Sequence, residues 1–307
     1  MNDPIRNVSG TAFWAAEYRV MQTAQPFPLF RDPWAAALAG TRGREVMRAL
    51  RGSKRSEWAV SMRTLALDQL LVEGLAEHGY DTVINLGAGL DARAFRLPLP
   101  QRLRWFDVDM PEIIAHRQDV LRDAAARCDY RALKADLSVD AVRKQTIAQI
   151  TRDSSKTLVI TEGLLEYLTP EAVHGLAREL RSHAAVHSWL CNLMSPSGLR
   201  QVAHFMRKLD QVNARILFTP EGPEVFRGDG WCEMEWVSLL THGMVYRRVP
   251  MWMRLVLPLL RFAPPAQRER VFRSVGVARL QRDDLVLSRQ AQPPSARSTN
   301  GQSFAEV

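Results

Sequence analysis

The sequence has 307 residues, of which 46% are hydrophobic and 24% are charged, so the chain can bury a substantial core. That composition is ordinary for a globular protein and argues against an intrinsically disordered chain. The formal net charge of +8 is compatible with an anionic partner, but the basic residues are spread out and no nucleic-acid-binding motif accompanies them.

Neither the first residues nor the longest apolar stretch indicates export or membrane insertion. The stretch MNDPIRNVSG lacks the apolar core of a secretory signal. Residues 249–262 are apolar but are interrupted by Arg254 and Pro258, and they fall short of the about 20 residues that span a bilayer. The three cysteines form no CxxC pair, so neither a metal site nor a disulfide framework is indicated. We therefore expect a cytoplasmic protein without stable membrane insertion.

The first 80 residues are predicted to be helical. An amphipathic pattern over residues 56–79 predicts a long helix, for which Ser56 is a suitable N-cap and Gly79 a suitable end. Upstream, Gly40 is predicted to end the helix that contains WAAALAG.

From residue 82 the pattern changes to alternating strands and helices. Strands are predicted over residues 82–86, 104–109, 130–135, 157–161 and 188–193. Helices are predicted over residues 111–126, 139–150 and 170–183. This alternation is typical of an α/β fold with a doubly wound parallel sheet, which binds its ligands at the carboxyl ends of the strands.

The pattern after residue 194 is less regular. It predicts helices over residues 197–216 and 221–228, a strand over 232–240, an inserted helical pair within 249–274 and a last strand over 277–282.

Two glycines, Gly87 and Gly89, stand where the first predicted strand should turn into its helix. A side chain at either position would block the close approach of a ligand to the backbone. The segment GAGLDA also fits the dinucleotide fingerprint G-x-G-x-x-G/A, so NAD is one possible ligand.

Acidic residues end the next three strands. Asp109 lies 20 positions after Gly89, where a carboxylate can accept hydrogen bonds from the hydroxyls of a ribose. Asp136 is placed to accept a hydrogen bond from an adenine amine, and Glu162 ends the fourth strand. Each acid also has a simpler interpretation, respectively as a helix N-cap, a turn residue and a structural hydrogen-bonding group. Together the three acids favour a cationic ligand such as S-adenosylmethionine over a pyrophosphate.

Several motifs, in order, resemble the leucine carboxyl methyltransferase family. They are INLGAGLDARAFRL, WFDVDMPEIIAHR, KADL and VITEGLLEYLTPEAV, together with PLFRDPWAAALAG and FTPEGPEVFRGDGW, and the resemblance covers about residues 11–240. Bacterial members of this family include O-methyltransferases of polyketide and other secondary metabolism. The resemblance implies a class I methyltransferase, with a Rossmann-like seven-stranded sheet and an N-terminal helical cap over the site.

The resemblance also implies roles for individual residues. Gly87, Ala88 and Gly89 would face the S-adenosylmethionine cofactor, and Asp109 would hold its ribose. Asp136 and Leu137 would contact the adenine, whereas Glu162 and Gly163 would lie near the methionine part. Arg63 would pair with the cofactor carboxylate; its alternative partner is Asp68. One departure from the family pattern is LDAR in place of LDTR, with Ala92 at the third position.

These assignments divide the chain into regions. We expect one methyltransferase domain over residues 1–288, followed by a disordered tail over 289–307. Within the domain, residues 1–80 form the cap, 81–194 the cofactor-binding core, and 195–288 the acceptor side with an inserted helical lid.

Methyl transfer from a sulfonium mainly requires that the acceptor be positioned. Tyr167 and Arg19 are the candidates for contact with the acceptor. Residues 249–274 would form the lid, with Trp252, Met253, Leu255, Leu257 and Phe262 lining a hydrophobic pocket. Two alternatives remain for this segment, a surface helix pair packed on the core and an amphipathic helix at a membrane surface.

The favoured function is O-methylation of a small molecule, at a carboxylate of a secondary metabolite. The alternatives are a protein carboxyl methyltransferase, a cofactor-binding protein without catalysis, and a nicotinamide-dependent dehydrogenase. Nucleic acid is disfavoured as a substrate because no Asn/Asp-Pro-Pro-aromatic tetrapeptide follows the fourth strand. The protein is expected to be a monomer or a homodimer.

Overall fold

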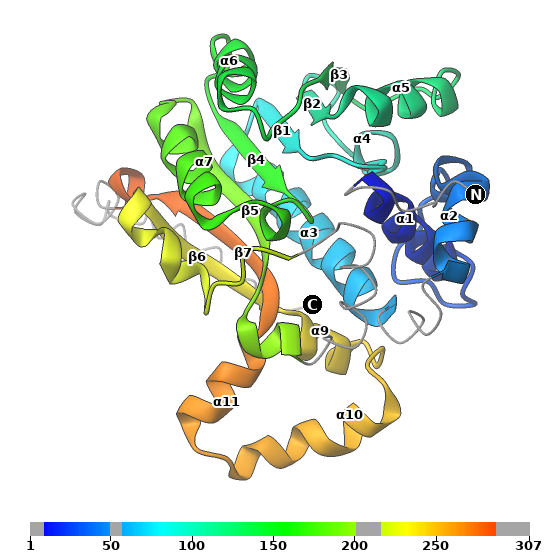
Figure 1. Cartoon of the computed structure of the whole chain (residues 1–307), viewed down its shortest axis with the longest axis vertical. Coiled ribbons are helices and arrows are strands. Elements are labelled where there is room, and N and C mark those ends of the chain that lie inside the picture. Colours follow the sequence, from blue (N-terminus) through cyan, green and yellow to red (C-terminus); the bar gives the residue numbers. More distant parts are fainter. Residues whose placement is uncertain (1–8, 50–56, 201–215, 287–307) are drawn as a thin grey trace, which may run out of the picture.

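A computed structural model describes residues 9–49, 57–200 and 216–286 and contains a seven-stranded sheet (Figure 1). The strand order is β3-β2-β1-β4-β5-β7-β6. The strands are β1 Thr82–Leu86, β2 Arg104–Asp109, β3 Asp129–Lys134, β4 Thr157–Thr161, β5 Val186–Met194, β6 Trp231–Ser238 and β7 Val275–Arg282. Each predicted strand is present, with its ends within two residues of the predicted ones, and the predicted α/β fold is confirmed.

The direction of the strands determines where a ligand can bind. β3, β2, β1, β4 and β5 are mutually parallel, and β7 is antiparallel to both of its neighbours. The chain order reverses at β1, which pairs with β2 on one side and with β4 on the other. Connections leave the carboxyl ends of β1 and β4 in opposite directions, so a crevice forms at this edge of the sheet.

Consecutive residues of the central strands point to opposite faces, and each face has its own apolar cluster. Val83 belongs to a cluster that includes Leu67 of α3, whereas Ile84 belongs to one that includes Leu176 of α7. The helices are α3 Glu57–His78, α6 Asp140–Thr151 and α7 Pro170–Ser182. Pro170 occupies the first turn of α7, and the Thr169 hydroxyl accepts a hydrogen bond from Ala172 N, which explains the start of that helix.

The N-terminal cap consists of α1 Ser9–Thr23, α2 Ala35–Ala49 and α3. Its residues share the first apolar cluster with the sheet, so cap and sheet have one continuous core. The prediction that Gly40 ends a helix is confirmed, because α2 consists of two helices joined across a kink at this residue. Gly40 adopts φ +56° and ψ −148°, and α2 resumes after this kink.

Three other predicted helices differ in detail. The helix predicted over 111–126 is shorter, α5 Pro111–Val120, and Leu121 is its C-cap. Residues 221–228 correspond to a 3₁₀ helix, η3 Pro223–Asp229. Most of the helix predicted over 197–216, and the tail predicted over 289–307, lie outside the described residues.

Between β6 and β7 the chain forms α9 Leu239–Val245, α10 Met251–Val256, the 3₁₀ helix η4 Leu257–Phe262 and α11 Pro265–Phe272. The predicted helical pair is therefore present. In Figure 1, α10 and α11 form a loop that projects from the rest of the fold. Among the described residues, we find no helix with the length and apolar character needed to cross a bilayer.

Candidate active site

A cavity of about 390 Å³ opens at the carboxyl ends of β1, β2, β3 and β4. All of the predicted site residues line it: Arg19, Arg63, Gly87, Ala88, Gly89, Asp109, Asp136, Leu137, Glu162, Gly163 and Tyr167. A larger hollow of about 880 Å³, between Arg31, Phe95 and Cys128, contains none of them. The structure thus brings together residues from α1, α3 and four strand ends, in the size range of a small-molecule site.

The glycines after β1 meet both a backbone and a packing requirement. Gly87 and Gly89 have φ of +66° and +53°, a region that favours glycine. A β-carbon on Gly87 would lie 3.1 Å from the Leu164 side chain, and one on Gly89 would lie 3.2 Å from Cβ of Ala12 in α1. The glycines therefore make room for neighbouring parts of the chain as well as for a ligand.

The N–H groups of the glycine loop are already used within the chain. Gly87 N and Ala88 N both donate to the carbonyl oxygen of Val108, at 2.9 and 3.2 Å. Gly89 N donates to Oδ2 of Asp109 at 2.6 Å. A pyrophosphate would require free N–H groups at this loop. This hydrogen bonding argues against the dinucleotide interpretation.

Asp109 presents its carboxylate to the cavity from the end of β2. Its Oδ1 accepts a hydrogen bond from Met110 N at 2.7 Å, while Oδ2 accepts from Gly89 N. Burial raises the pKa of Asp109, and these two hydrogen bonds oppose that effect. Each carboxylate oxygen keeps a second lone pair for a ligand hydroxyl. The N-cap position of α5 belongs to Met110, so the alternative of Asp109 as an N-cap was wrong.

Asp136 both stabilises a turn and lines the cavity. Its Oδ1 accepts hydrogen bonds from the backbone N and the hydroxyl of Ser138, at 2.9 and 2.6 Å. The turn interpretation is therefore confirmed. The second carboxylate oxygen, Oδ2, forms no hydrogen bond with a described residue, which leaves an acceptor beside Leu137 for a ligand amine.

Glu162 is held between two arginines at the end of β4. Arg63 Nε donates to Oε1 at 2.9 Å, and Arg93 Nη1 donates to Oε2 at 2.7 Å. Burial acts to raise the pKa of Glu162, but Arg93, Arg63 and Arg19 lower it to about 2. Glu162 is therefore ionised at neutral pH, and its structural hydrogen-bonding role is confirmed.

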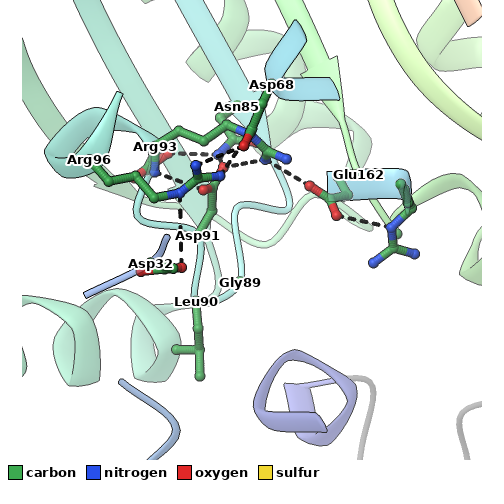
Figure 2. Close-up of polar contacts among 12 residues, drawn as sticks. Asp32, Asp68, Asn85, Gly89, Leu90, Asp91, Arg93, Arg96 and Glu162 are labelled. Carbon is green, nitrogen blue, oxygen red and sulfur yellow. Dashed lines mark hydrogen bonds and ion pairs between the residues drawn. The ribbon is translucent and has the colours of Figure 1, made fainter. Parts of the chain in front are cut away.

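Arg93 is the centre of an ion network beneath the cavity wall, drawn in Figure 2. It is 2% exposed and also pairs with Asp68 and Asp91, at 2.7 Å each. Arg96 pairs with Asp68 at 2.7 Å. Asp68 thus serves Arg93 and Arg96, and the alternative that Arg63 pairs with Asp68 was wrong.

A second buried arginine, Arg117 of α5, supports the glycine loop. Its Nη1 donates to the carbonyl oxygens of Gly89 and Asp91, at 3.0 and 2.5 Å, and its Nη2 pairs with Asp107. Sequence reasoning missed Arg93, Arg96 and Arg117. The available signal was the presence of arginines among the apolar residues of the segments LDARAFRL and MPEIIAHR.

Arg63 retains donors for a ligand. Its Nη1 and Nη2 lie 3.7 and 3.8 Å from the point that a β-carbon on Gly163 would occupy. Neither nitrogen forms a hydrogen bond with a described residue. Gly163 itself has φ +66° and donates its N–H to Oδ1 of Asn192 at 2.7 Å. A guanidinium with two open nitrogens can bind a carboxylate through two parallel hydrogen bonds.

Arg19 ties α1 to the glycine loop. Its Nε donates to Oδ2 of Asp32 at 2.9 Å, and its Nη2 donates to the carbonyl oxygen of Leu90 at 2.6 Å. Its Nη1 forms no hydrogen bond with a described residue.

Tyr167 ends η2 Leu165–Tyr167 and is hydrogen-bonded to Thr11 of α1. Burial raises the pKa of its hydroxyl, which is therefore protonated at neutral pH. The hydroxyl can donate a hydrogen bond to an acceptor but does not act as a base.

Sequence reasoning also missed Glu166, which precedes Tyr167 and lines the same cavity. Asn192 Nδ2 donates to its Oε2 at 2.9 Å, so Asn192 links Glu166 to Gly163. Burial raises the pKa of Glu166, while Arg63 and Asn192 lower it.

The predicted lid does not line this cavity. Trp252, Leu255 and Phe262 are 60%, 69% and 75% exposed, and no residue of α10, η4 or α11 is buried. The prediction that Trp252, Met253, Leu255, Leu257 and Phe262 form an acceptor pocket was therefore wrong. The alternative of a surface helix pair packed on the core holds only where α11 contacts α9. Among the described residues, no cluster of three or more His, Cys, Asp and Glu side chains could hold a metal ion.

Known proteins match both the sequence and the fold. The family model described as leucine carboxyl methyltransferase matches residues 12–181, more than half of the chain. The chain belongs to the leucine carboxyl methyltransferase family. This methyltransferase is 33% identical to a Frankia alni protein over 81% of this chain and 92% of the relative. That relative is named a "putative S-adenosyl-L-methionine-dependent methyltransferase".

Two solved structures share the methyltransferase's fold. A DUF574 family protein of Streptomyces avermitilis has a TM-score of 0.57 at 14% identity, with 87% of this chain and 96% of that chain covered. A Thermobifida fusca structure titled as a "putative methyltransferase" has a TM-score of 0.51 at 18% identity, with coverage of 81% and 92%. The family resemblance inferred from the sequence and the predicted class I methyltransferase fold are both confirmed.

Proposed function

We propose that this methyltransferase transfers the methyl group of S-adenosylmethionine to an oxygen of a small molecule, a carboxylate of a secondary metabolite. The observation that carries the cofactor assignment is one cavity in which Arg63 offers two open nitrogens while Asp109 and Asp136 offer acceptors. S-adenosylmethionine has a carboxylate to meet the arginine, and ribose hydroxyls and an adenine amine to meet the acids. The satisfied N–H groups of the glycine loop suit such a ligand better than a pyrophosphate.

Each residue has a binding task in this proposal. Asp109 accepts hydrogen bonds from the ribose hydroxyls, and Asp136 with the Leu137 backbone receives the adenine. Arg63 pairs with the amino-acid carboxylate, beside Glu162 and Gly163. When bound, S-adenosylmethionine supplies a methyl group that its sulfonium already activates. The chain itself must align an acceptor oxygen with that methyl group and exclude water.

Arg19 and Tyr167 support a carboxylate acceptor. Both line the cavity next to the cofactor residues, and both are hydrogen-bond donors at neutral pH. A carboxylate is already ionised at that pH, so it requires orientation by donors and no general base. We assign this orienting role to Arg19 and Tyr167.

A hydroxyl acceptor is the second candidate, and Glu166 favours it. This carboxylate lines the cavity, and burial raises its pKa, which brings it nearer to the range of an effective general base.

The first experiment is calorimetric titration with S-adenosylmethionine, S-adenosylhomocysteine and NAD in parallel. Binding of the first two without NAD supports the cofactor assignment, whereas binding of NAD alone contradicts it. Radiolabelled S-adenosylmethionine is then incubated with matched carboxylic acids and phenols. Base-labile product from the acids identifies a methyl ester, and base-stable product from the phenols identifies the second candidate. Label on a protein C-terminus would point to a protein carboxyl methyltransferase, and cofactor binding without turnover would point to a non-catalytic protein.

A further inference from the structure

The segment 250–272, here called the arginine arm, exposes large apolar side chains without a partner. It contains α10, η4 and α11, none of which has a buried residue. Six of the twelve large apolar side chains that the described residues expose lie within residues 251–262: Met251 at 66%, Trp252 at 60%, Leu255 at 69%, Val256 at 50%, Leu259 at 59% and Phe262 at 75%. A concentration of this kind marks an interaction surface.

The spacing of these side chains gives the arm one apolar face. Within α10, positions 251, 252, 255 and 256 follow the i, i+1, i+4, i+5 pattern that places residues on one side of a helix, and Leu259 follows in η4. The stripe includes Trp252, and the arm also carries Phe262. Tryptophan concentrates at the interface between water and lipid headgroups.

The arm is also positively charged. It contains four arginines, Arg254, Arg261, Arg268 and Arg270, and one acid, Glu269. None of these arginines forms an ion pair with a residue that the structure describes. Arg261, Arg268 and Arg270 are exposed, and the Arg261 guanidinium lies 4.6 Å from the centre of the Phe262 ring. An apolar stripe with unpaired arginines beside it is the pattern of a helix that lies in the surface of an anionic membrane.

The arm leaves the sheet at the edge that holds the cavity. β6 and β5 are each antiparallel to β7, so β6 runs in the same direction as β5, β4 and β1. The arm follows the carboxyl end of β6 and precedes the amino end of β7. It therefore projects from the carboxyl-end edge of the sheet, as Figure 1 shows.

We propose that the arginine arm docks this protein onto a lipid surface with anionic headgroups. The apolar stripe enters the headgroup layer, and the arginines contact lipid phosphates. Docking in this way turns the carboxyl-end edge of the sheet, with its cavity, towards the membrane. The attachment is peripheral, in agreement with the absence of a membrane-crossing helix from the described residues.

Charge favours a lipid surface over a second copy of the chain. A two-fold contact between two arms would bring four unpaired arginines against four others, which is electrostatically unfavourable. The chain as a whole carries a net charge of +8, so it repels its own copies and is attracted to an anionic surface.

Co-sedimentation with vesicles tests the proposal without any need for methyl transfer. The full-length protein is mixed with vesicles of phosphatidylcholine, with or without phosphatidylglycerol. We expect binding to the anionic vesicles that weakens as salt is raised. The variant R268Q/R270Q should bind about 30-fold more weakly, at about fivefold per arginine, and Trp252→Asp should bind more weakly to both kinds of vesicle. Because the arm buries no residue, these variants should retain the circular dichroism spectrum of the parent protein.

Matched controls lie at other parts of the surface. The double variant R102Q/R152Q removes two exposed arginines, which precede the amino ends of β2 and β4. The variant Val142→Asp places a charge on the exposed face of α6. Both controls should bind vesicles like the parent protein. Equal losses in controls and arm variants would overturn the proposal, as would absence of vesicle binding. Sedimentation velocity tests whether the arm instead binds a second copy of the chain. If the protein forms a concentration-dependent dimer that Trp252→Asp abolishes, and does not bind vesicles, the arm serves self-association and the proposal is wrong.

Discussion

Arg19 of α1 donates a hydrogen bond to the carbonyl oxygen of Leu90, a residue 71 positions further along the chain, at 2.6 Å. The same guanidinium pairs with Asp32, whose side chain is fully buried. One side chain thus joins the cap to the glycine loop, so the cap is part of the cavity wall.

Replacement of Arg19 by methionine should lower the free energy of unfolding by about 3 kcal/mol, because a buried carboxylate loses its partner. Urea denaturation measures this change. The exposed Arg31→Met is the matched control and should change the unfolding free energy by less than about 0.5 kcal/mol. A similarly small effect of Arg19→Met would show that the Arg19–Asp32 pair does not stabilise the cap.

Gly89→Ala should destabilise the protein by about 1–3 kcal/mol, because φ is +53° and the new β-carbon would lie 3.2 Å from Ala12. The variant Ala12→Gly removes the contacting atom. Combined with Gly89→Ala, it should recover the steric part of the loss and leave the backbone part. Thermal unfolding of both single variants and the double variant separates the two contributions. Strictly additive effects would contradict contact between α1 and the loop.

Arg63→Gln should weaken the binding of S-adenosylhomocysteine about 10-fold to 100-fold, the range for a lost hydrogen bond to a charged group. Its effect on 5′-methylthioadenosine should be small, because that ligand lacks the amino-acid carboxylate. Calorimetry with both ligands makes the comparison. The exposed Arg48→Gln controls for the loss of one positive charge. Equal weakening of both ligands would place Arg63 away from the carboxylate.

Asp109→Asn should weaken cofactor binding by about 1–3 kcal/mol, since an amide loses one acceptor oxygen and the charge. This variant keeps the side-chain shape. Calorimetric titration gives the affinity, and Asp119→Asn on the exposed face of α5 is the matched control. Unchanged affinity for S-adenosylmethionine would remove Asp109 from the ribose site.

Stability should depend on the ionisation of Glu162. Its pKa falls from an ordinary 4.5 to about 2 in the folded state, so the folded protein favours the carboxylate. The resulting stabilisation is fully present above the unfolded pKa, and it is lost as the pH falls from about 5 towards about 2. Urea denaturation of the wild type and of Glu162→Gln across this range should show a difference that shrinks with decreasing pH. A constant difference would contradict the assigned pKa.

The sequence predicts the parts of this molecule that depend on local pattern. The strands β1 and β4 are short apolar runs, and the acids Asp109, Asp136 and Glu162 lie at the carboxyl ends of β2, β3 and β4, so the parallel topology brings these acids to one edge. Their convergence in one cavity could therefore be predicted without coordinates.

Other features depend on packing between distant segments. Arg93 pairs with Asp68 of α3, with Asp91 of the loop after β1, and with Glu162 at the end of β4. No spacing rule in the sequence connects these three acids. Gly40 ends a helix as its residue type predicts, but only the fold shows that a second helix begins directly after this kink. The arginine arm, similarly, has the sequence pattern of a buried lid. Only the fold reveals that its apolar side chains are exposed.

The Arg93 network also sets an order of events during synthesis. Asp68 and Asp91 emerge from the ribosome before Arg93, but Glu162, its third partner, is made 69 residues later. In a nascent chain that ends before β4, the Arg93 guanidinium lacks one of its three acidic partners. The strand β4, which positions that partner, is also missing. The Arg93 network can therefore be completed only after β4 has joined β1, when about half of the 307-residue chain has been synthesised.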